Sequence, residues 1–266
     1  MTDKSLMVGI NKYPGCPLNG CVNDITDMAH YLMDHCTMPR ANIRLLVDGR
    51  ATKQAIVDRL HWLVDGAKPG DRLFFHFSGH GVQVPTRNPA GEVDNLDEAI
   101  CPQNFNWSDD TMIRDKEFNQ MFSKVPVGVN FVWVSDSCHS GTLDRSFSNS
   151  VPRSMPMPED ISWGVQTAKE AGITPQGMGL GMPGVPLNVA LISGCKSNQT
   201  SADAFINGRY NGACTYYLLK ELVRSPGAPM TQVVTNLNVA LRAAHYEQMP
   251  QLEGSLALMG KPFMAR

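Results

Sequence analysis

One histidine and one cysteine stand out, because each follows an apolar segment directly and has small residues beside it. His80 lies in the segment 78–81, Ser-Gly-His-Gly, and Cys138 lies in 136–141, Asp-Ser-Cys-His-Ser-Gly. A free thiol is only a few per cent thiolate at neutral pH, and a neighbouring imidazole that takes its proton raises the reactive fraction. The glycines let a substrate backbone approach and let loop N–H groups face a developing oxyanion. The pair predicts nucleophilic catalysis, with Cys138 as nucleophile and His80 as general base.

Two other interpretations of these residues stay open. Taken singly, a cysteine at a strand end is most often a small buried side chain, and a histidine is most often structural or on the surface. A metal site could instead draw on His76, His80, Cys138 and His139. Ligand geometry opposes it, because His76 lies within a predicted strand and His139 should point away from Cys138.

Alternating strands and helices are predicted to position the two loops. Short apolar segments predict strands at 6–10, 43–47, 72–77, 130–135 and 187–193, with another at 255–259. Helical periodicity predicts helices at 25–33, 52–64, 213–224 and 231–248. This order predicts an α/β fold with a mostly parallel sheet and crossover helices. Active sites of such sheets lie at the carboxyl ends of the strands, where both loops would emerge.

The segment 146–186 interrupts this pattern. It is rich in Pro, Gly, Ser and Met, which predicts a lid or flexible linker and no core element. Its glycines suggest a phosphate-binding loop, but Pro183 and the lack of a preceding strand oppose that reading. We therefore expect a single domain over 1–266, with a larger part at 1–145, the linker at 146–186 and a smaller part at 187–266.

Composition restricts the partners and the compartment. The 266 residues are 42% hydrophobic with a formal net charge of -2, and basic residues are scattered among acidic ones, which argues against a nucleic-acid partner. The seven cysteines are an odd number without regular spacing, so we expect reduced thiols. The chain has no secretory signal and no apolar run near 20 residues. We expect a cytoplasmic monomer with no membrane partner.

Five segments resemble the metacaspase and orthocaspase family of caspase-like cysteine peptidases. They are residues 20–24, 78–81, 136–141, 193–203 and 250–254. The separation of His80 and Cys138, 138 minus 80 or 58 residues, agrees with the gap of about fifty known for the wider caspase group. The resemblance implies the caspase-hemoglobinase fold, a three-layer α/β sandwich, and an endopeptidase that forms an acyl-enzyme on Cys138.

The resemblance also implies roles for further residues. The backbone N–H groups of Gly81 and Cys138 would form the oxyanion hole. Family members cleave proteins or peptides after Arg or Lys, which an acidic pocket receives; the matching residues here are Cys21, Asp24, Ser78 and Asp136. Two buried carboxylates attract a guanidinium and repel the carboxylate of an aspartate side chain. Asp24 is also of a type favoured as a helix N-cap.

Many family members bind activating calcium, and the matching positions here are Asp97, Asp115 and, one residue early, Asp144. Lys116 stands where the family has the second of two paired aspartates, and its cation would repel calcium. The acidic segment could equally be a solvated loop. The thiol chemistry itself needs no cofactor.

The basic residues after Cys138 are candidate self-cleavage points, and we favour Arg153 and Lys169 over Arg145. Two alternatives to a peptidase remain at this stage. One is a catalytically idle caspase-like interaction module, and the other is a transpeptidase or ligase that uses the same dyad.

Overall fold

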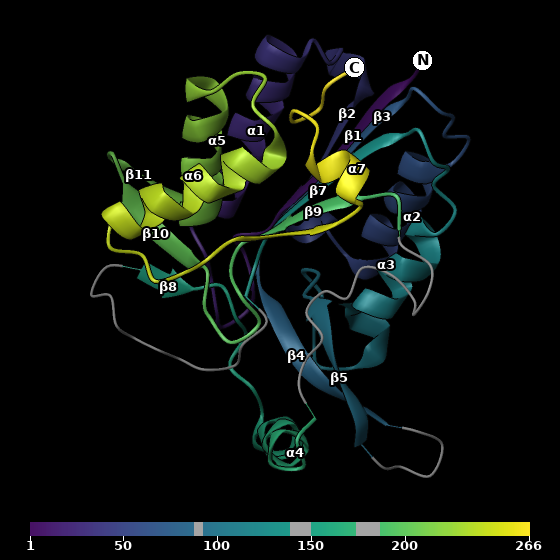
Figure 1. The fold of residues 1–266 in the computed structure, drawn as a ribbon. Helices are drawn as coiled ribbons and strands as arrows, with labels where there is room; N and C mark the ends of the chain where they lie inside the picture. Colours follow the sequence, from purple (N-terminus) through teal and green to yellow (C-terminus); the bar gives the residue numbers. More distant parts are fainter. Residues whose placement is uncertain (88–92, 139–149, 174–186) are drawn as a thin grey trace.

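The computed structural model describes residues 1–87, 93–138, 150–173 and 187–266. Its centre is a six-stranded sheet in the order β12-β9-β7-β3-β1-β2 (Figure 1). The bounds are β1 Asp3–Gly9, β2 Ile43–Val47, β3 Arg72–Ser78, β7 Asn130–Asp136, β9 Ala190–Ser193 and β12 Gln251–Gly254. Five of these strands run parallel and β12 is antiparallel to β9. The predicted mostly parallel sheet is confirmed.

Helices cover both faces of this sheet and make three layers (Figure 1). The helices are α1 Cys21–Cys36, α2 Lys53–Val64, α3 Asp115–Phe122, α4 Glu159–Glu170, α5 Ala213–Arg224, α6 Met230–Ala243 and α7 Leu256–Met259. Alternate residues of β3 divide between two cores: Phe75 packs in the core that includes residues of α2 and α3, and Phe74 in the core with α1, α5 and α6. Since side chains alternate along a strand, a sheet buried on both faces needs such continuous apolar runs.

Two small antiparallel sheets extend the carboxyl end of the central one. The first has the order β4-β5-β6 and the second β11-β10-β8. Their strands are β4 Gly81–Arg87, β5 Val93–Ile100, β6 Ile113–Arg114, β8 Ser150–Pro152, β10 Ala202–Ile206 and β11 Arg209–Gly212. None of these strands was predicted. β6 and β8 are only two and three residues long, and β4 and β5 mix polar and apolar residues without a continuous apolar run.

The segment 146–186 has more structure than its composition predicted. Residues 150–152 form β8 on the edge of β10, and residues 159–170 form α4, which packs on β4 and β5 (Figure 1). Val165 and Ala168 are the buried side of α4. The expectation that the segment holds no core element is therefore wrong for these residues, because an amphipathic helix needs only a few apolar positions to pack.

The C-terminal prediction also needs correction. The predicted strand at 255–259 is the short helix α7, and the last strand is β12, just before it. Gly254 has a φ of 108°, a left-handed conformation that turns the chain out of β12. The helix predicted at 231–248 is confirmed as α6 but ends at Ala243. In the described part of the chain, no helix has both the length and the apolar character to cross a membrane.

Candidate active site

The two candidate catalytic loops leave neighbouring strands at the same edge of the sheet. β3 and β7 are parallel, and Ser78 pairs with Asp136 at their carboxyl ends. Beyond this pair the chain continues into His80 and Cys138, both fully buried. The parallel register therefore brings together the loops in which the sequence placed the dyad.

Both loops direct a backbone N–H group at one carbonyl oxygen, which belongs to Arg153. Gly81 N donates to Arg153 O at 3.0 Å and Cys138 N at 3.1 Å. The Arg153 N–H donates in turn to Ser201 O at 3.0 Å, and Met155 N–H to Gly81 O at 3.4 Å. The chain around Arg153 therefore crosses the site in an extended form, with its carbonyl between two convergent donors. This is the arrangement that stabilises an oxyanion.

Hydrogen bonds fix the orientation of the His80 ring. Nε2 is 2.8 Å from the carbonyl oxygen of Cys16, which can only accept, so Nε2 carries the proton. Nδ1 then has a free lone pair, and it makes no hydrogen bond of normal geometry within the described residues. The Tyr13 ring lies 4.6 Å from the His80 ring, and the Tyr13 hydroxyl accepts the His80 backbone N–H. Burial lowers the pKa of His80 to about 4, against the carbonyls of Cys16 and Arg153, which raise it. The imidazole is therefore neutral at physiological pH and can accept a proton.

The Cys138 sulfur lies against the backbone of Ser201. The thiol is placed to donate to Ser201 O at 3.1 Å, and the Ser201 N–H donates to Sγ. Ser201 thus contacts the sulfur and also accepts the N–H of Arg153.

The Arg153 side chain fills a buried acidic pocket. Its Nη2 lies 2.8 Å from Asp24 and 2.9 Å from Asp203, and its Nη1 lies 3.3 Å from Asp136. Nη1 also donates to the hydroxyl of Ser78 at 2.8 Å. The structure therefore brings together three predicted pocket residues and adds one carboxylate that the prediction did not include.

The carboxyls of this pocket differ in their pKa values. Burial raises the pKa of Asp24 to about 6, although Arg153 lowers it. Burial also raises the pKa of Asp136, but Arg153 and hydrogen bonds from Ser201 and Thr215 lower it more, so its net pKa is below the ordinary value. The pocket is therefore anionic at neutral pH and bound to a cation.

The pocket has room for a guanidinium because residue 212 is a glycine. A Cβ atom built on Gly212 would overlap the Asp136 carboxylate and the Arg153 guanidinium. The Gly212 N–H donates to Asp24 at 2.9 Å. Cys21 is buried beside the pocket, where burial raises the pKa of its thiol. Asp24 lies inside the first turn of α1, whose N-cap is Gly20, so the helix-cap reading of Asp24 is wrong.

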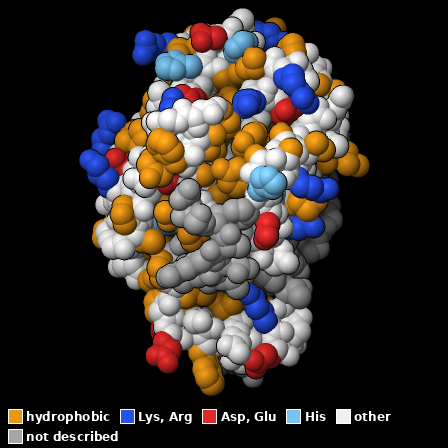
Figure 2. All heavy atoms as spheres, turned by 90° about the vertical axis from the view of Figure 1, so that its left-hand side faces the viewer, with side chains coloured by type: hydrophobic (Ala, Val, Ile, Leu, Met, Phe, Trp, Pro, Cys, Tyr) orange, Lys and Arg blue, Asp and Glu red, His pale blue; other side chains and the backbone are white. Residues whose placement is uncertain are grey.

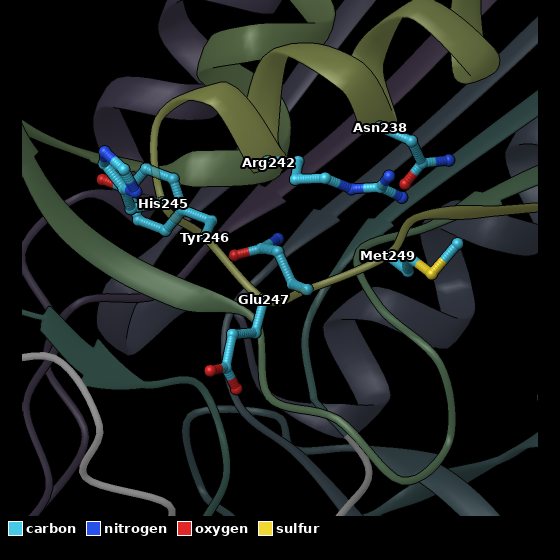
Figure 3. Close-up of a pocket in the computed structure, with 7 residues that line it drawn as sticks. Asn238, Arg242, His245, Tyr246, Glu247 and Met249 are labelled. Atoms are coloured by element: carbon cyan, nitrogen blue, oxygen red, sulfur yellow. The ribbon is translucent and has the colours of Figure 1, made fainter.

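A C-terminal segment supports the loop that holds the sulfur. Gln248 is buried and donates to Gly194 O at 2.9 Å and to Ser201 Oγ at 3.1 Å. Gln199 donates to the backbone oxygen of Glu247 at 2.8 Å. Figure 3 shows the surface pocket that this segment forms below α6. Gln248 lines this pocket and also holds Ser201, whose backbone contacts the Cys138 sulfur.

Of the three predicted calcium ligands, the structure describes Asp97 and Asp115. Asp97 is buried and its two oxygens pair with Arg114 at 3.0 Å and with Lys116 at 3.1 Å. Burial, and to a smaller extent the nearby Asp97 carboxylate, raises the pKa of Asp115 to about 7. Asp144 and Arg145 lie outside the described residues, within which no group of three or more His, Cys, Asp or Glu could hold a metal ion. These residues do not fit calcium, because two side-chain cations already neutralise Asp97.

Several residues of the site were missed or lie elsewhere. Lys169 is exposed in the last turn of α4 and not in the pocket. The missed residues are Tyr13, Cys16, Ser201, Asp203 and Thr215. Asp203 lies in the segment 193–203, which resembles the metacaspase family, and this resemblance was the only signal in the sequence for it. Tyr13 and Cys16 gave no signal, since their contacts depend on a loop far from His80 in sequence.

The surface over the smaller part of the chain carries mixed charges. Figure 2 shows Lys, Arg, Asp and Glu side chains scattered among hydrophobic ones over the face that includes α5 and α6. The seven cysteines are all free thiols.

Comparison with known proteins agrees with the geometry. A family model described as the metacaspase, peptidase C14 domain matches residues 3–145. Metacaspase-1 of Cryptococcus neoformans is 32% identical over 287 residues, which cover 95% of this chain and 62% of that protein. Metacaspase-1 of Candida glabrata is also 32% identical, over 95% of this chain and 72% of that protein.

A solved crystal structure of a Geobacter sulfurreducens protein has the same fold, with a TM-score of 0.70 and 23% identity over 99% of this chain and 98% of that one. The chain spans less than two thirds of the length of several of these curated relatives, 62% in the Cryptococcus protein. The family model nevertheless matches more than half of the chain, and the curated relatives align with nearly all of it. The chain therefore belongs to the metacaspase family, peptidase C14.

Proposed function

We propose that this protein is a cysteine endopeptidase that cleaves after Arg or Lys and cuts its own chain between Arg153 and Ser154. Cys138 is the nucleophile and His80 the general base. The observation that carries the proposal is the double engagement of Arg153: its carbonyl oxygen meets two backbone donors and its guanidinium meets buried carboxylates. These contacts, all made by one residue, support a reaction site and a cation pocket that act on the same arginine.

The chemistry follows from these contacts. The Cys138 thiol passes its proton to His80 Nδ1, and the sulfur attacks the carbonyl carbon of Arg153. The negative charge that develops on Arg153 O is stabilised by the N–H groups of Gly81 and Cys138. His80 returns the proton to the nitrogen of Ser154, which leaves as an amine, and a thioester remains on Cys138. Water activated by His80 then hydrolyses the thioester and releases the Arg153 carboxylate.

Peptide assays test the proposal directly. Fluorogenic peptides of one sequence ending in Arg, Lys or Asp are incubated with the protein, and mass spectrometry of the stored protein identifies its fragments. We expect release from the Arg or Lys peptide, none from the Asp peptide, and fragments 1–153 and 154–266. Release from none of the peptides would contradict the proposal that the protein is a peptidase. Preference for the Asp peptide would contradict the proposal that the acidic pocket binds the residue before the scissile bond.

Two alternatives are less well supported. An idle interaction module would not need an acidic pocket and two convergent N–H donors around one peptide unit. A transpeptidase or ligase would share the dyad and the thioester, so product analysis separates it: the ligase joins the Arg carbonyl to an added amine, and the peptidase releases a free carboxylate. The free cysteines suit a reducing compartment, and we propose the cytoplasm.

The pH dependence of peptide cleavage should report Asp24. Below about pH 6, Asp24 with a bound guanidinium is protonated and one ion pair is lost, whereas His80, with a pKa of about 4, is still neutral. We expect kcat to fall as the pH drops through about 6. The acidic limb of the kcat/KM profile should lie at a higher pH than that of kcat. The reason is that the free pocket lacks the guanidinium that lowers the pKa of Asp24. A limb near pH 4 in both profiles would assign it to His80 instead.

Calcium is not expected to activate the enzyme. Lys116 and Arg114 supply the positive charge that Asp97 needs, so calcium or a chelator should change the rate by less than about twofold. Lys116→Asp replaces this cation with a carboxylate near Asp97 and Asp115, and should bind calcium in a calorimetric titration. Lys124→Asp, on an exposed residue, is the matched control and should not. Strong activation of the unaltered protein by calcium would contradict the prediction.

A further inference from the structure

The pocket around Arg153 contains a third carboxylate, Asp203, which no sequence argument had given a role. Asp203 is fully buried in β10, and its Oδ1 lies 2.9 Å from Arg153 Nη2. Asp24 comes from α1 and Asp136 from the end of β7, so the three acids reach the guanidinium from three separate elements. Three carboxylates around one cation are more than charge balance requires.

The acceptors are divided between the two terminal nitrogens of the guanidinium. Nη2 donates to Asp24 and Asp203, while Nη1 donates to the Ser78 hydroxyl and to the backbone oxygen of Asp136. The Nε of Arg153 has no hydrogen-bond partner among the described residues. The pocket therefore recognises the forked end of the side chain and not its stem.

Asp203 is held in place by backbone donors. Gly20 N donates to its Oδ1 at 2.9 Å and Asn19 N donates to its Oδ2 at 2.8 Å. The residue also pairs through its backbone with Val151 in β8, two residues before Arg153. The strand that aligns the bound peptide thus also carries the carboxylate at Nη2, in a fixed orientation.

We propose that Asp203 is a specificity-determining residue that makes the pocket select arginine over lysine. The inference rests on the proposed function and refines its substrate class. A lysine ends in one ammonium nitrogen, one bond short of the two terminal nitrogens of arginine, and it cannot satisfy acceptors on both prongs of the fork. With a lysine bound, the Asp203 carboxylate would then be left buried without its cation. A site built to hydrogen-bond a group rejects the analogue that lacks it.

The test compares the peptides Val-Pro-Arg and Val-Pro-Lys, which carry the same fluorogenic leaving group. The first of them copies residues 151–153, the segment that ends in the bound arginine. We expect the protein to prefer the Arg peptide in kcat/KM by about 10- to 100-fold, the factor of one or two charge-assisted hydrogen bonds. Asp203→Asn should reduce this ratio by about tenfold, because the loss falls on the Arg peptide. Asp27→Asn, an acid on the outer side of α1 that pairs with Arg209, should leave the ratio unchanged.

Two further measurements keep the test decisive if Asp203→Asn disturbs the turn at 19–20. Titration of reactive Cys138 counts the folded sites, and the Arg-to-Lys ratio does not depend on that count. With the unaltered protein, a peptide with monomethylated arginine should lose about tenfold in kcat/KM, because a methyl group replaces one terminal N–H. Equal cleavage of Arg and Lys peptides, or an unchanged ratio in Asp203→Asn, overturns this inference alone. Cleavage of neither peptide overturns the proposed function.

Discussion

Cys138→Ala is expected to lower the cleavage rate of Arg peptides by about 10⁴-fold or more and to leave the chain uncut after Arg153. The alanine removes the sulfur on which the thioester would form, while the two N–H donors and the acidic pocket stay in place. Rates with a fluorogenic Arg peptide and the intact mass of the stored protein measure both effects. Because Arg153 remains bound, the uncut variant should unfold at a temperature close to that of the unaltered chain before it is cut.

Cys36→Ala is the matched control for this variant. Cys36 is also a buried thiol, but it lies at the end of α1. Its replacement removes a sulfur of similar burial and should keep cleavage and self-processing. Equal residual activity in both variants would show that a contaminating enzyme or another residue carries the activity.

The sequence could predict the sheet and the place of the two candidate catalytic loops because both depend on local signals. The strands β3 and β7 begin at their predicted first residues and α5 coincides with its predicted range, since buried parallel strands and amphipathic helices leave continuous patterns in the sequence. His80 and Cys138 follow such strands directly. Once the sheet is parallel, both loops must emerge at one edge.

The rest of the site depends on contacts between distant segments. Ser201 reaches the sulfur of Cys138 because the loop before β10 returns past the end of β7, and its place is fixed by Gln248. Asp203 reaches the pocket because β10 pairs with β8 on one side and β11 on the other. None of these pairings has a periodic pattern that a single sequence displays, because the strands are short.

Arg153 shows why composition misleads when a segment is itself bound as a ligand. The sequence around it is rich in proline, as in an exposed linker, yet its side chain is fully buried. The three carboxylates that bury it belong to the pocket and not to a hydrophobic core. A proline at 152 fits here, because neighbouring residues of a strand point their N–H groups in opposite directions and the N–H that the site uses is that of Arg153.

The bound arginine should also inhibit the enzyme until its chain is cut and released. A tethered segment acts at an effective concentration near millimolar, well above that of a typical added peptide. Two variants that both prevent self-cleavage separate binding from cutting. Arg153→Gln removes the cation from the pocket, whereas Ser154→Pro keeps the cation but turns the scissile bond into a prolyl amide. The bridge between Gly81 and Ser154 uses the carbonyl of Arg153 and the N–H of Met155, so the proline removes neither bond.

We expect an arginine-based electrophile that alkylates Cys138 to label Arg153→Gln at least about tenfold faster than Ser154→Pro. Both proteins should have the mass of the full chain, and Lys169→Gln should self-cleave like the unaltered protein because Lys169 lies in α4. Arg153→Gln should also unfold at a lower temperature, since three buried carboxylates lose their counter-ion. An added arginine amide should restore part of that loss. Equal labelling rates in the two variants would mean that Arg153 does not block the pocket, and cleavage of Arg153→Gln into the same fragments would refute Arg153 as the cut site.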